Sequence, residues 1–426
     1  MQKKLLTVAV AGALAVPVAA LAQSSVEVYG TINMAFGLFK YSEGTAAGTP
    51  SVSKWDVAQG ASNWGLRGRE SVGAGLTAWF QIETNTPMER SNDIAITPAS
   101  RNSAVGLQGG WGNVFMGQWT TPWADLDSLW SIGTVGFWGP VTSIIGRRET
   151  TGTAPNPSCV NGHDSGVPGV SNLICNAIEA GGGVGHAFWR RASQSVSYQS
   201  PVFGGVQIKT LAQTNEGKST TGVVANPWLW SSSVQWAGMG GRARIGVAYD
   251  RHHDFTSVGN SDTGWAIKGG WNFGVVDVGL AYERITYKTF SGDCRAKQYG
   301  AAVAVPIGQG AIRGSFSVAK DIEGSYVGAQ TAVNTAGGSC GAVPTAAAPS
   351  NDNGAKQFNL GYDHRFSKRT TVGFGYARIK NDAGAQFTWT GAPPVQNGVS
   401  GSANSATTPF VGSDPSTWYV SMTHRF

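Results

Sequence analysis

Strict two-residue alternation is the feature that most limits how this sequence can fold. In the segment that ends at Phe426, Trp418, Val420 and Met422 share one parity with Phe426, while the residues between them are mainly polar. Successive side chains of a strand point to opposite faces, so this pattern predicts a strand with one apolar and one polar face. A strand that ends on an aromatic residue is typical of a closed barrel, because pairing the last strand with the first removes the sheet edge.

The same alternation recurs along the whole chain. It predicts sixteen strands, at about 26–41, 61–71, 75–85, 101–109, 112–120, 189–200, 203–213, 228–237, 241–252, 263–273, 275–288, 296–305, 310–320, 355–366, 370–380 and 416–426. Short connections alternate with longer loops, among them 42–60, 121–188, 321–354 and 381–415. An even number of strands with short turns at one rim and long loops at the other indicates an all-β fold, a transmembrane antiparallel β-barrel. Hydrocarbon offers the backbone no hydrogen-bond partner, so such a sheet must close.

Composition excludes several other classes of protein. Charged residues make up only 13% of the chain, and no run of 18 apolar residues follows the N-terminal segment, which argues against transmembrane helices. The basic residues are scattered singly, whereas nucleic-acid-binding proteins cluster theirs. A soluble propeller or sandwich would need a sequence repeat and strands rich in aliphatic residues on two inner faces, and the sequence has neither.

The N-terminal segment predicts export. A cationic head at 2–4 precedes an apolar stretch at 5–21, and Ala20-Leu21-Ala22 matches the small-x-small cleavage pattern. We therefore expect a signal peptide at 1–22, a mature barrel at 23–426 and a location in the outer membrane of a Gram-negative cell. An uncleaved membrane anchor is the alternative.

The four cysteines all fall in predicted long loops at the same rim. An even number in an exported chain suggests two disulfides, with three possible connectivities. Loop positions favour Cys159–Cys175 within the third loop and Cys294–Cys340 between adjacent loops. A zinc site is not expected, because the sequence has no CxxC pair and no suitably spaced histidines.

Lumen-facing positions of a wide barrel are polar and set its selectivity. Because Trp64 and Leu66 take the outer face, alternation directs Asn63, Arg67 and Arg69 inward. It also directs inward Glu83, Arg191, Lys209, Arg244 and Arg313. For the last three we expect ordinary solvation of a wet wall. Arg101 shares the parity of outward residues, but a bulge near the loop end of its strand could reverse it.

Six short motifs occur in the order found in a known family: VEVYG (26–30), WGLRGRE (64–70), GLTA (75–78), VGL (105–107), SVSYQSP (195–201) and SKRT (367–370). Together with Phe426 they make the chain resemble the trimeric general diffusion porins of β-proteobacteria, of the Neisseria and Burkholderia type. The resemblance implies a sixteen-stranded barrel, a homotrimer, and a third loop folded into the lumen that narrows it. It also implies contact with outer-membrane lipid and lipopolysaccharide, no cofactor, and passive diffusion of small hydrophilic solutes and ions.

Anion-preferring relatives line their constriction with arginines. Two of these correspond to Arg101 and Arg191, while a third corresponds to Asn63, with Arg69 placed to restore the missing charge. Across the lumen, Glu83 and the third-loop acids Asp125 and Asp127 could complete a transverse field. The resemblance therefore implies mild anion selectivity.

Three alternatives stay open at this point. Trp123, Trp130, Trp138 and Trp189 lie in or beside the third loop, where they could pack against the wall or form a track for a sugar or aromatic solute in a substrate-specific channel. An outer-membrane hydrolase is remote, because no GxSxG occurs and the His252-His253 pair suggests solvated rim residues. The long loops are also compatible with an added role as a surface adhesin.

Overall fold

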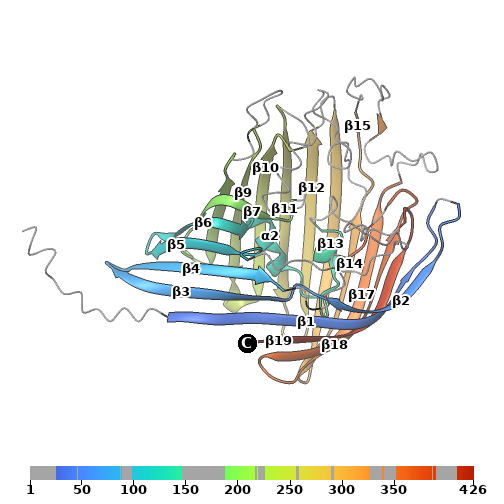
Figure 1. Cartoon of the computed structure of the whole chain (residues 1–426), viewed down its shortest axis with the longest axis horizontal. Coiled ribbons are helices and arrows are strands. Elements are labelled where there is room, and N and C mark those ends of the chain that lie inside the picture. The colour runs from blue at the N-terminus through green and yellow to red at the C-terminus, as the bar shows by residue number, and fades with distance from the viewer. Residues whose placement is uncertain are drawn as a thin grey trace, which may run out of the picture.

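One antiparallel sheet of seventeen strands closes on itself in the computed structural model (Figure 1). The structure describes residues 25–45, 47–86, 88, 98–145, 188–215, 218, 226–255, 259–288, 292–326, 338–339, 352–385, 387–389 and 410–426. Successive positions of the wall pair in chain order, and β1 (Ser25–Tyr41) pairs with β19 (Pro415–Arg425) to close the ring. No helix in this part of the chain is long and apolar enough to cross a membrane.

The strands β2 (Val52–Gln59) and β3 (Asn63–Gly73) act as one strand of the wall. Both pair with β1, β2 with its second half and β3 with its first half. A bend at 60–62 separates them, where Ala61 has φ of 54°. The seventeen strands therefore occupy sixteen positions around the barrel, which confirms the predicted strand number.

The remaining strands follow in chain order around the wall. They are β4 (Leu76–Asn85), β5 (Ser103–Gly109), β6 (Gly112–Thr120), β7 (Arg191–Gln199), β8 (Val206–Gln213), β9 (Trp228–Gly238), β10 (Ala243–His253), β11 (Ser261–Asn272), β12 (Asp277–Lys288), β13 (Asp293–Ile307), β14 (Gly310–Ala319), β17 (Ala355–Arg365) and β18 (Thr370–Asn381). A separate pair, β15 (Ser325–Tyr326) and β16 (Gly338–Ser339), lies in the predicted loop 321–354. The predicted loop 42–60 also contains the strand β2.

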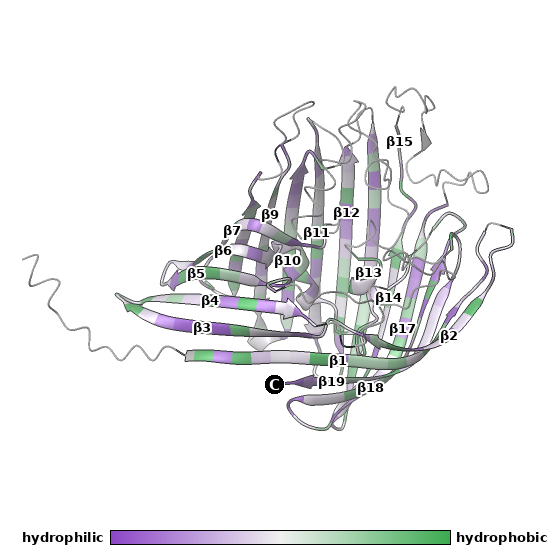
Figure 2. Cartoon of the chain, in the orientation of Figure 1, coloured by the Kyte–Doolittle hydropathy of each residue, from purple (hydrophilic) through white to green (hydrophobic). Residues whose placement is uncertain are grey.

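The two faces of the wall differ as the alternation predicts. Trp418, Val420 and Met422 are 52%, 49% and 51% exposed, whereas Tyr419 and Ser421 between them are buried. Hydrophobic and hydrophilic residues alternate along β3 and β4 in Figure 2. The exposed apolar residues therefore mark the outer face, and their neighbours on each strand mark the inner face.

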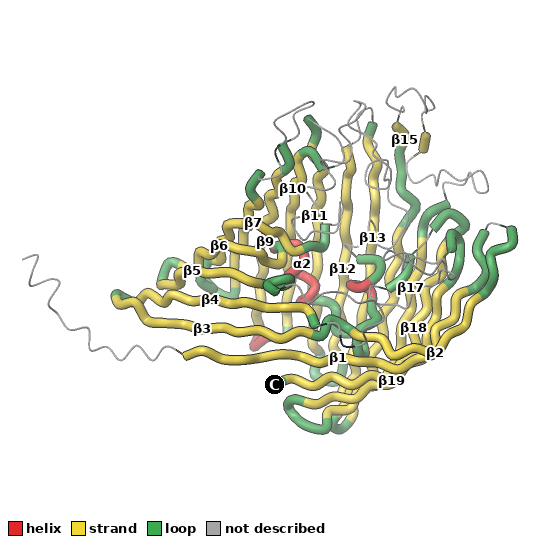
Figure 3. The backbone as a smooth tube through the Cα atoms, viewed as in Figure 1, coloured by secondary structure: helices red, strands yellow, loops and turns green. Residues whose placement is uncertain are grey.

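Short helices interrupt the third predicted loop. They are α2 (Pro122–Asp125) and the 3₁₀ helices Leu126–Leu129 and Pro140–Thr142, drawn in red among the strands in Figure 3. Thr121 caps α2 by accepting a hydrogen bond from the Ala124 N–H, and Pro122 fits the first turn, where no donor is needed. A further 3₁₀ turn, Met239–Gly241, joins β9 to β10.

Two predictions fall mainly outside the described residues. The predicted signal peptide, 1–22, lies there entirely and stays a prediction. Cys294 is disulfide-bonded, but Cys159, Cys175 and Cys340 lie in undescribed segments, so the expected pairing stays a prediction as well.

Candidate channel lumen

Residues 121–145, the first part of the predicted third loop, lie along the inner face of the wall. The Tyr419 hydroxyl donates to the Val135 carbonyl at 2.8 Å, and the Asn359 amide donates to the Gly133 carbonyl at 2.8 Å. Backbone carbonyls removed from water need partners, and the wall supplies them here. The rest of this loop, 146–187, lies outside the described residues.

Two inward arginines bind the third loop. Arg244 donates to the Leu129 carbonyl at 2.6 Å and Arg313 to the Ile132 carbonyl at 2.6 Å. Arg244 also pairs with Asp277, at 2.7 Å, and Arg313 with Asp363, at 3.1 Å. The expected role for these residues, simple solvation of the wall, is therefore incomplete, because alternation alone could not show that a loop covers them.

The indoles of this loop pack against the wall. Trp123, Trp130 and Trp138 are 0% exposed. Trp138 contacts the rings of Phe39 and Tyr419, with centroids 5.1 and 4.8 Å away. Rings enclosed in this way stabilise the loop but cannot contact a solute in the lumen, so they provide no aromatic track.

The strands carry glycines where the loop crosses the wall. A Cβ added at Gly279 would lie 2.1 Å from the Trp130 carbonyl oxygen, and one at Gly264 would lie 2.5 Å from the Phe188 ring. Contacts this short are impossible for a side chain, so these glycines allow the loop to approach the strands.

A buried ionic triad holds the start of the loop. The Lys268 ammonium on β11 lies 2.6 Å from Asp127 and 2.8 Å from Glu283, and the side chains of Lys268 and Glu283 are 0% exposed. The Trp123 indole N–H also donates to Glu283, at 3.2 Å. Charges removed from water must be paired, so Asp127 serves to fix the loop to β11 and β12.

His252 and Asp250 are also buried beneath the loop. Both side chains are 0% exposed, with His252 Nε2 3.7 Å from Asp250 Oδ2, and the His252 ring stacks on Phe188 at 4.2 Å. The expectation that His252 is a solvated rim residue is wrong, because its even position on β10 faces inward where the loop covers the wall. The neighbouring His253 faces outward and is partly exposed.

On the other side of the lumen, Glu83 on β4 contacts Tyr29 from β1 and Arg101, which lies just before β5. Arg101 Nε lies 2.5 Å from Glu83 Oε1, and the Tyr29 hydroxyl donates to Glu83 Oε2 at 3.0 Å. Arg101 thus faces inward with Glu83. Strand β5 begins at Ser103, not at Arg101 as predicted, so the parity of Val105 does not extend to Arg101.

Asn102 links this group to β7. Its side-chain oxygen accepts from Arg191 Nε at 3.0 Å and from the Thr120 hydroxyl at 2.8 Å. The Arg191 guanidinium also lies over the Trp189 ring, 5.6 Å from its centroid. The predicted residues Arg101 and Arg191 therefore flank one asparagine, which no sequence pattern singled out.

Arg67 and Arg69 lie nearer the short-turn rim. Arg67 pairs with Glu27 at 2.9 Å and lies over the Tyr29 ring, 4.8 Å from its centroid. Tyr29 thus connects Arg67 to the Glu83 group. Both arginines line a recess of about 530 Å³ on the inner wall, together with Trp79 and Trp119.

Asn63 has a local structural role. Its amide donates to the Ala61 carbonyl at 2.8 Å, at the bend between β2 and β3. This hydrogen bond ties the Asn63 side chain to the bend and not to the arginine group.

Asp125 pairs with Lys209 on β8, at 3.2 Å. Burial raises the pKa of the Asp125 carboxyl, and the Lys209 ammonium offsets part of this rise. All three acids of the expected transverse field are therefore ion-paired: Glu83 with Arg101, Asp125 with Lys209 and Asp127 with Lys268.

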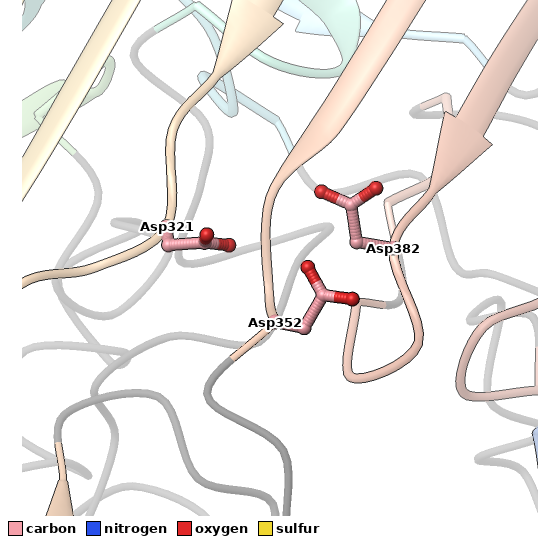
Figure 4. Close-up of side chains that lie close together, drawn as sticks. All are labelled: Asp321, Asp352 and Asp382. Atoms are coloured by element: carbon pink, nitrogen blue, oxygen red, sulfur yellow. The ribbon is translucent and has the colours of Figure 1, made fainter.

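A group of acids lies at the loop rim. Carboxylate oxygens of Asp321, Asp352 and Asp382 lie within 4.8 Å of one another, beyond the ends of β14, β17 and β18 (Figure 4). Burial and the two neighbouring carboxylates raise the pKa of Asp382. All three are at least partly exposed, and exposed acidic groups of this kind are common without a metal.

The inner wall thus has one sector covered by a loop and one lined by long charged side chains. A family model for Gram-negative porins matches residues 7–384. The chain belongs to the Gram-negative porin family. It is an outer-membrane protein whose barrel forms a diffusion channel.

Individual relatives agree with this assignment. The outer membrane porin protein 32 of Delftia acidovorans is 25% identical over 395 residues, which cover 89% of this chain and 90% of the relative. The major outer membrane protein P.IB of Neisseria gonorrhoeae is 31% identical over 153 residues, 35% of this chain and 41% of the relative. These are β-proteobacterial porins, as the sequence motifs indicated.

Solved structures share the fold. An anion-selective porin from Comamonas acidovorans aligns with a TM-score of 0.61 at 21% identity and covers 95% of this chain and 100% of that one. A trimer form of OmpT from Vibrio cholerae aligns with a TM-score of 0.55 at 12% identity and covers 95% and 99%.

Proposed function

We propose that this porin passes small hydrophilic solutes and ions with a mild preference for anions, and that Arg67, Arg101 and Arg191 set this preference. The observation that carries the proposal is their connection through Tyr29, Glu83 and Asn102 on the sector that residues 121–145 leave uncovered. Arg69 adds a cation that forms no ion pair among the described residues. The selectivity is mild because carboxylates accompany two of the three arginines, Glu27 beside Arg67 and Glu83 beside Arg101, which weakens the net field.

The Comamonas neighbour supports the same sign of selectivity, since that protein is known as an anion-selective porin. A substrate-specific channel that uses the third-loop tryptophans has less support, because Trp123, Trp130 and Trp138 are enclosed. We propose no catalytic role.

Planar-bilayer recording in a salt gradient tests the selectivity. Replacing Arg101 and Arg191 together by Ala should shift the reversal potential towards cations and increase the conductance, because two cations and two long side chains leave the lumen. Lys368→Ala, in the exposed turn between β17 and β18, is the control for net charge and should change neither. An unchanged reversal potential in the double variant would place the selectivity elsewhere.

We also propose a homotrimer, with support from the trimer form of the Vibrio neighbour. Sedimentation of the detergent-purified protein tests this, and a monomer mass would contradict it. Cleavage of a signal peptide after Ala22 is likewise a proposal, and the mass of the mature chain tests it.

A further inference from the structure

Three aromatic side chains, Trp79, Phe115 and Trp119, meet on the inner face of β4 and β6. We call them the aromatic cluster. The centroid of the Trp79 ring lies 5.4 Å from that of Phe115 and 5.8 Å from that of Trp119, and the other two centroids are 5.0 Å apart. Lumen-facing positions of a wide barrel are normally polar. An aromatic cluster on a wet wall therefore needs an explanation beyond barrel formation.

Packing explains one of these rings fully and the other two only in part. Phe115 is 2% exposed, so its ring belongs to the interior of the wall. Trp79 and Trp119 are only partly buried, and both line the recess of about 530 Å³ on the inner wall. Trp119 also packs against the buried group that contains Leu211, which holds its ring in place. Two indoles therefore present apolar surface to the lumen.

The Trp79 indole is held in one orientation. Its N–H donates to the Asn113 side-chain oxygen at 2.8 Å. A Cβ added at Gly106 would lie 2.8 Å from the indole, so the ring lies close against the backbone of β5. Because the single donor of the indole is already used, Trp79 offers a ligand its ring surface and no hydrogen bond. Such a surface suits an aromatic ring better than a sugar, whose hydroxyls need polar partners.

The charged side chains of the recess are positive in sum. Arg67 and Arg69 bring two positive charges and Glu27, which lies 2.9 Å from Arg67, brings one negative charge. Arg69 forms no ion pair within the described part of the chain, and the register places it directly opposite Trp79. A guanidinium binds a carboxylate through two parallel hydrogen bonds. The recess therefore combines an available guanidinium with apolar ring surface, which is what an aromatic monocarboxylate requires.

Amide side chains complete the lining of the recess. Gln108 on β5 is exposed, and the register places it opposite both Thr77 and Asn113, which also line the recess. Its amide N–H groups can donate to a carboxylate. Gln81 on β4 donates to the Asn102 carbonyl at 2.8 Å, so its amide is fixed at the edge of the recess. Pockets that bind small molecules have volumes of about 300–1,000 Å³, a range that includes this recess.

We propose that this recess binds aromatic monocarboxylates as they cross the lumen, with the ring against Trp79 and Trp119 and the carboxylate on Arg69. The inference rests on the open, anion-preferring lumen proposed above, but the site lies nearer the short-turn rim than Arg101 and Arg191 and recognises a ring as well as a charge. Binding is weak and rapidly reversible, because a solute in a channel must leave as readily as it enters.

The test is planar-bilayer recording of the folded full-length protein at constant ionic strength, with benzoate as the probe and the concentration that halves the current as the readout. Benzoate should act at a concentration at least about threefold lower than acetate, which lacks the ring, or benzyl alcohol, which lacks the charge. Trp79→Leu and Arg69→Gln should each raise the half-blocking concentration of benzoate at least about threefold. The matched controls are Trp111→Leu, in the turn between β5 and β6, and Arg369→Gln, in the turn between β17 and β18, and both should leave it unchanged.

A wild-type response to benzoate in Trp79→Leu or Arg69→Gln would overturn the proposal, as would an equal loss in either control. Equal block by acetate, benzyl alcohol or glucose would overturn the assignment to aromatic carboxylates. If Trp79→Leu does not fold, benzoate against acetate on the wild type tests the ring contact, and Arg69→Gln, at an exposed residue, tests the carboxylate contact. The two proposals fail separately, because anion preference is measured by the wild-type reversal potential in potassium chloride alone. An anion-preferring channel that benzoate does not block would overturn only the present inference.

Discussion

The two sectors of the inner wall use similar residues for different purposes. On β10–β14, inward arginines donate to loop carbonyls, and glycines let the loop lie close to the strands. On the opposite sector, Arg67, Arg101 and Arg191 are linked through Tyr29, Glu83 and Asn102, and Arg67 lines a recess of the inner wall. We therefore expect an inward arginine to govern permeation only where no loop covers it.

Of the substitutions that test this difference between the two sectors, replacement of Lys268 should have the largest effect. Lys268→Met leaves Asp127 and Glu283 buried together without their cation, and breaking a buried pair typically costs about 3–5 kcal/mol. We expect a lower thermal unfolding midpoint and a larger, noisier single-channel current as the loop leaves the wall. Lys297→Met, which removes a cation from the outer face, is the control for the channel current. A quiet channel of wild-type conductance in Lys268→Met would show that the triad does not hold the loop.

Gly279→Ala should have the next largest effect. The added methyl would lie 2.1 Å from the Trp130 carbonyl oxygen, so the loop or the strand must move. We expect increased current noise and a destabilisation of about 1–3 kcal/mol, measured by bilayer recording and thermal unfolding. Gly314→Ala is the matched control, because the nearest atom to its added methyl is 3.5 Å away. Equal behaviour of the two variants would contradict close packing at Gly279.

Replacing Arg244 and Arg313 by Ala sharpens the comparison between the two sectors. Both lose a hydrogen bond to a loop carbonyl, so the expected result is more frequent fluctuation of the current. The reversal potential should change much less than in the Arg101 and Arg191 variant, because the loop covers these side chains. A shift of equal size in both variants would show that the covered sector also faces the ions.

The smallest expected effect comes from Asp125. Its raised pKa means that this carboxyl takes up a proton at a higher pH than an exposed aspartate as the solution is acidified. Protonation removes a negative charge and leaves the Lys209 cation unbalanced, so anion preference should increase as the pH falls through that range. Asp125→Asn should show the increased preference already at neutral pH and lose this component of the pH dependence, as measured by the reversal potential.

Alternation determined the wall almost completely. Strand number, the outer position of Trp418, Val420 and Met422, and the inward position of Arg67 follow from the two-residue period of a pleated strand. The expectation that His252 is a solvated rim residue came from its position at the loop end of its strand, and it was wrong because that position does not show that a loop covers the side chain. Alternation also could not place Arg101, which precedes the first paired residue of β5 and is therefore free of that strand's parity.

What only the tertiary structure decided is which inward residues meet water. The triad of Asp127, Lys268 and Glu283 joins a loop to two strands across 141 positions of the chain between Asp127 and Lys268, and no local pattern marks that contact. Asn102 likewise links Arg191 to the arginine group over 89 positions. The sequence alone determined the barrel, because alternation is set by neighbouring residues and a sheet that crosses hydrocarbon must close. The lumen required the fold, because the path of a loop depends on packing and ion pairs between residues far apart in the chain.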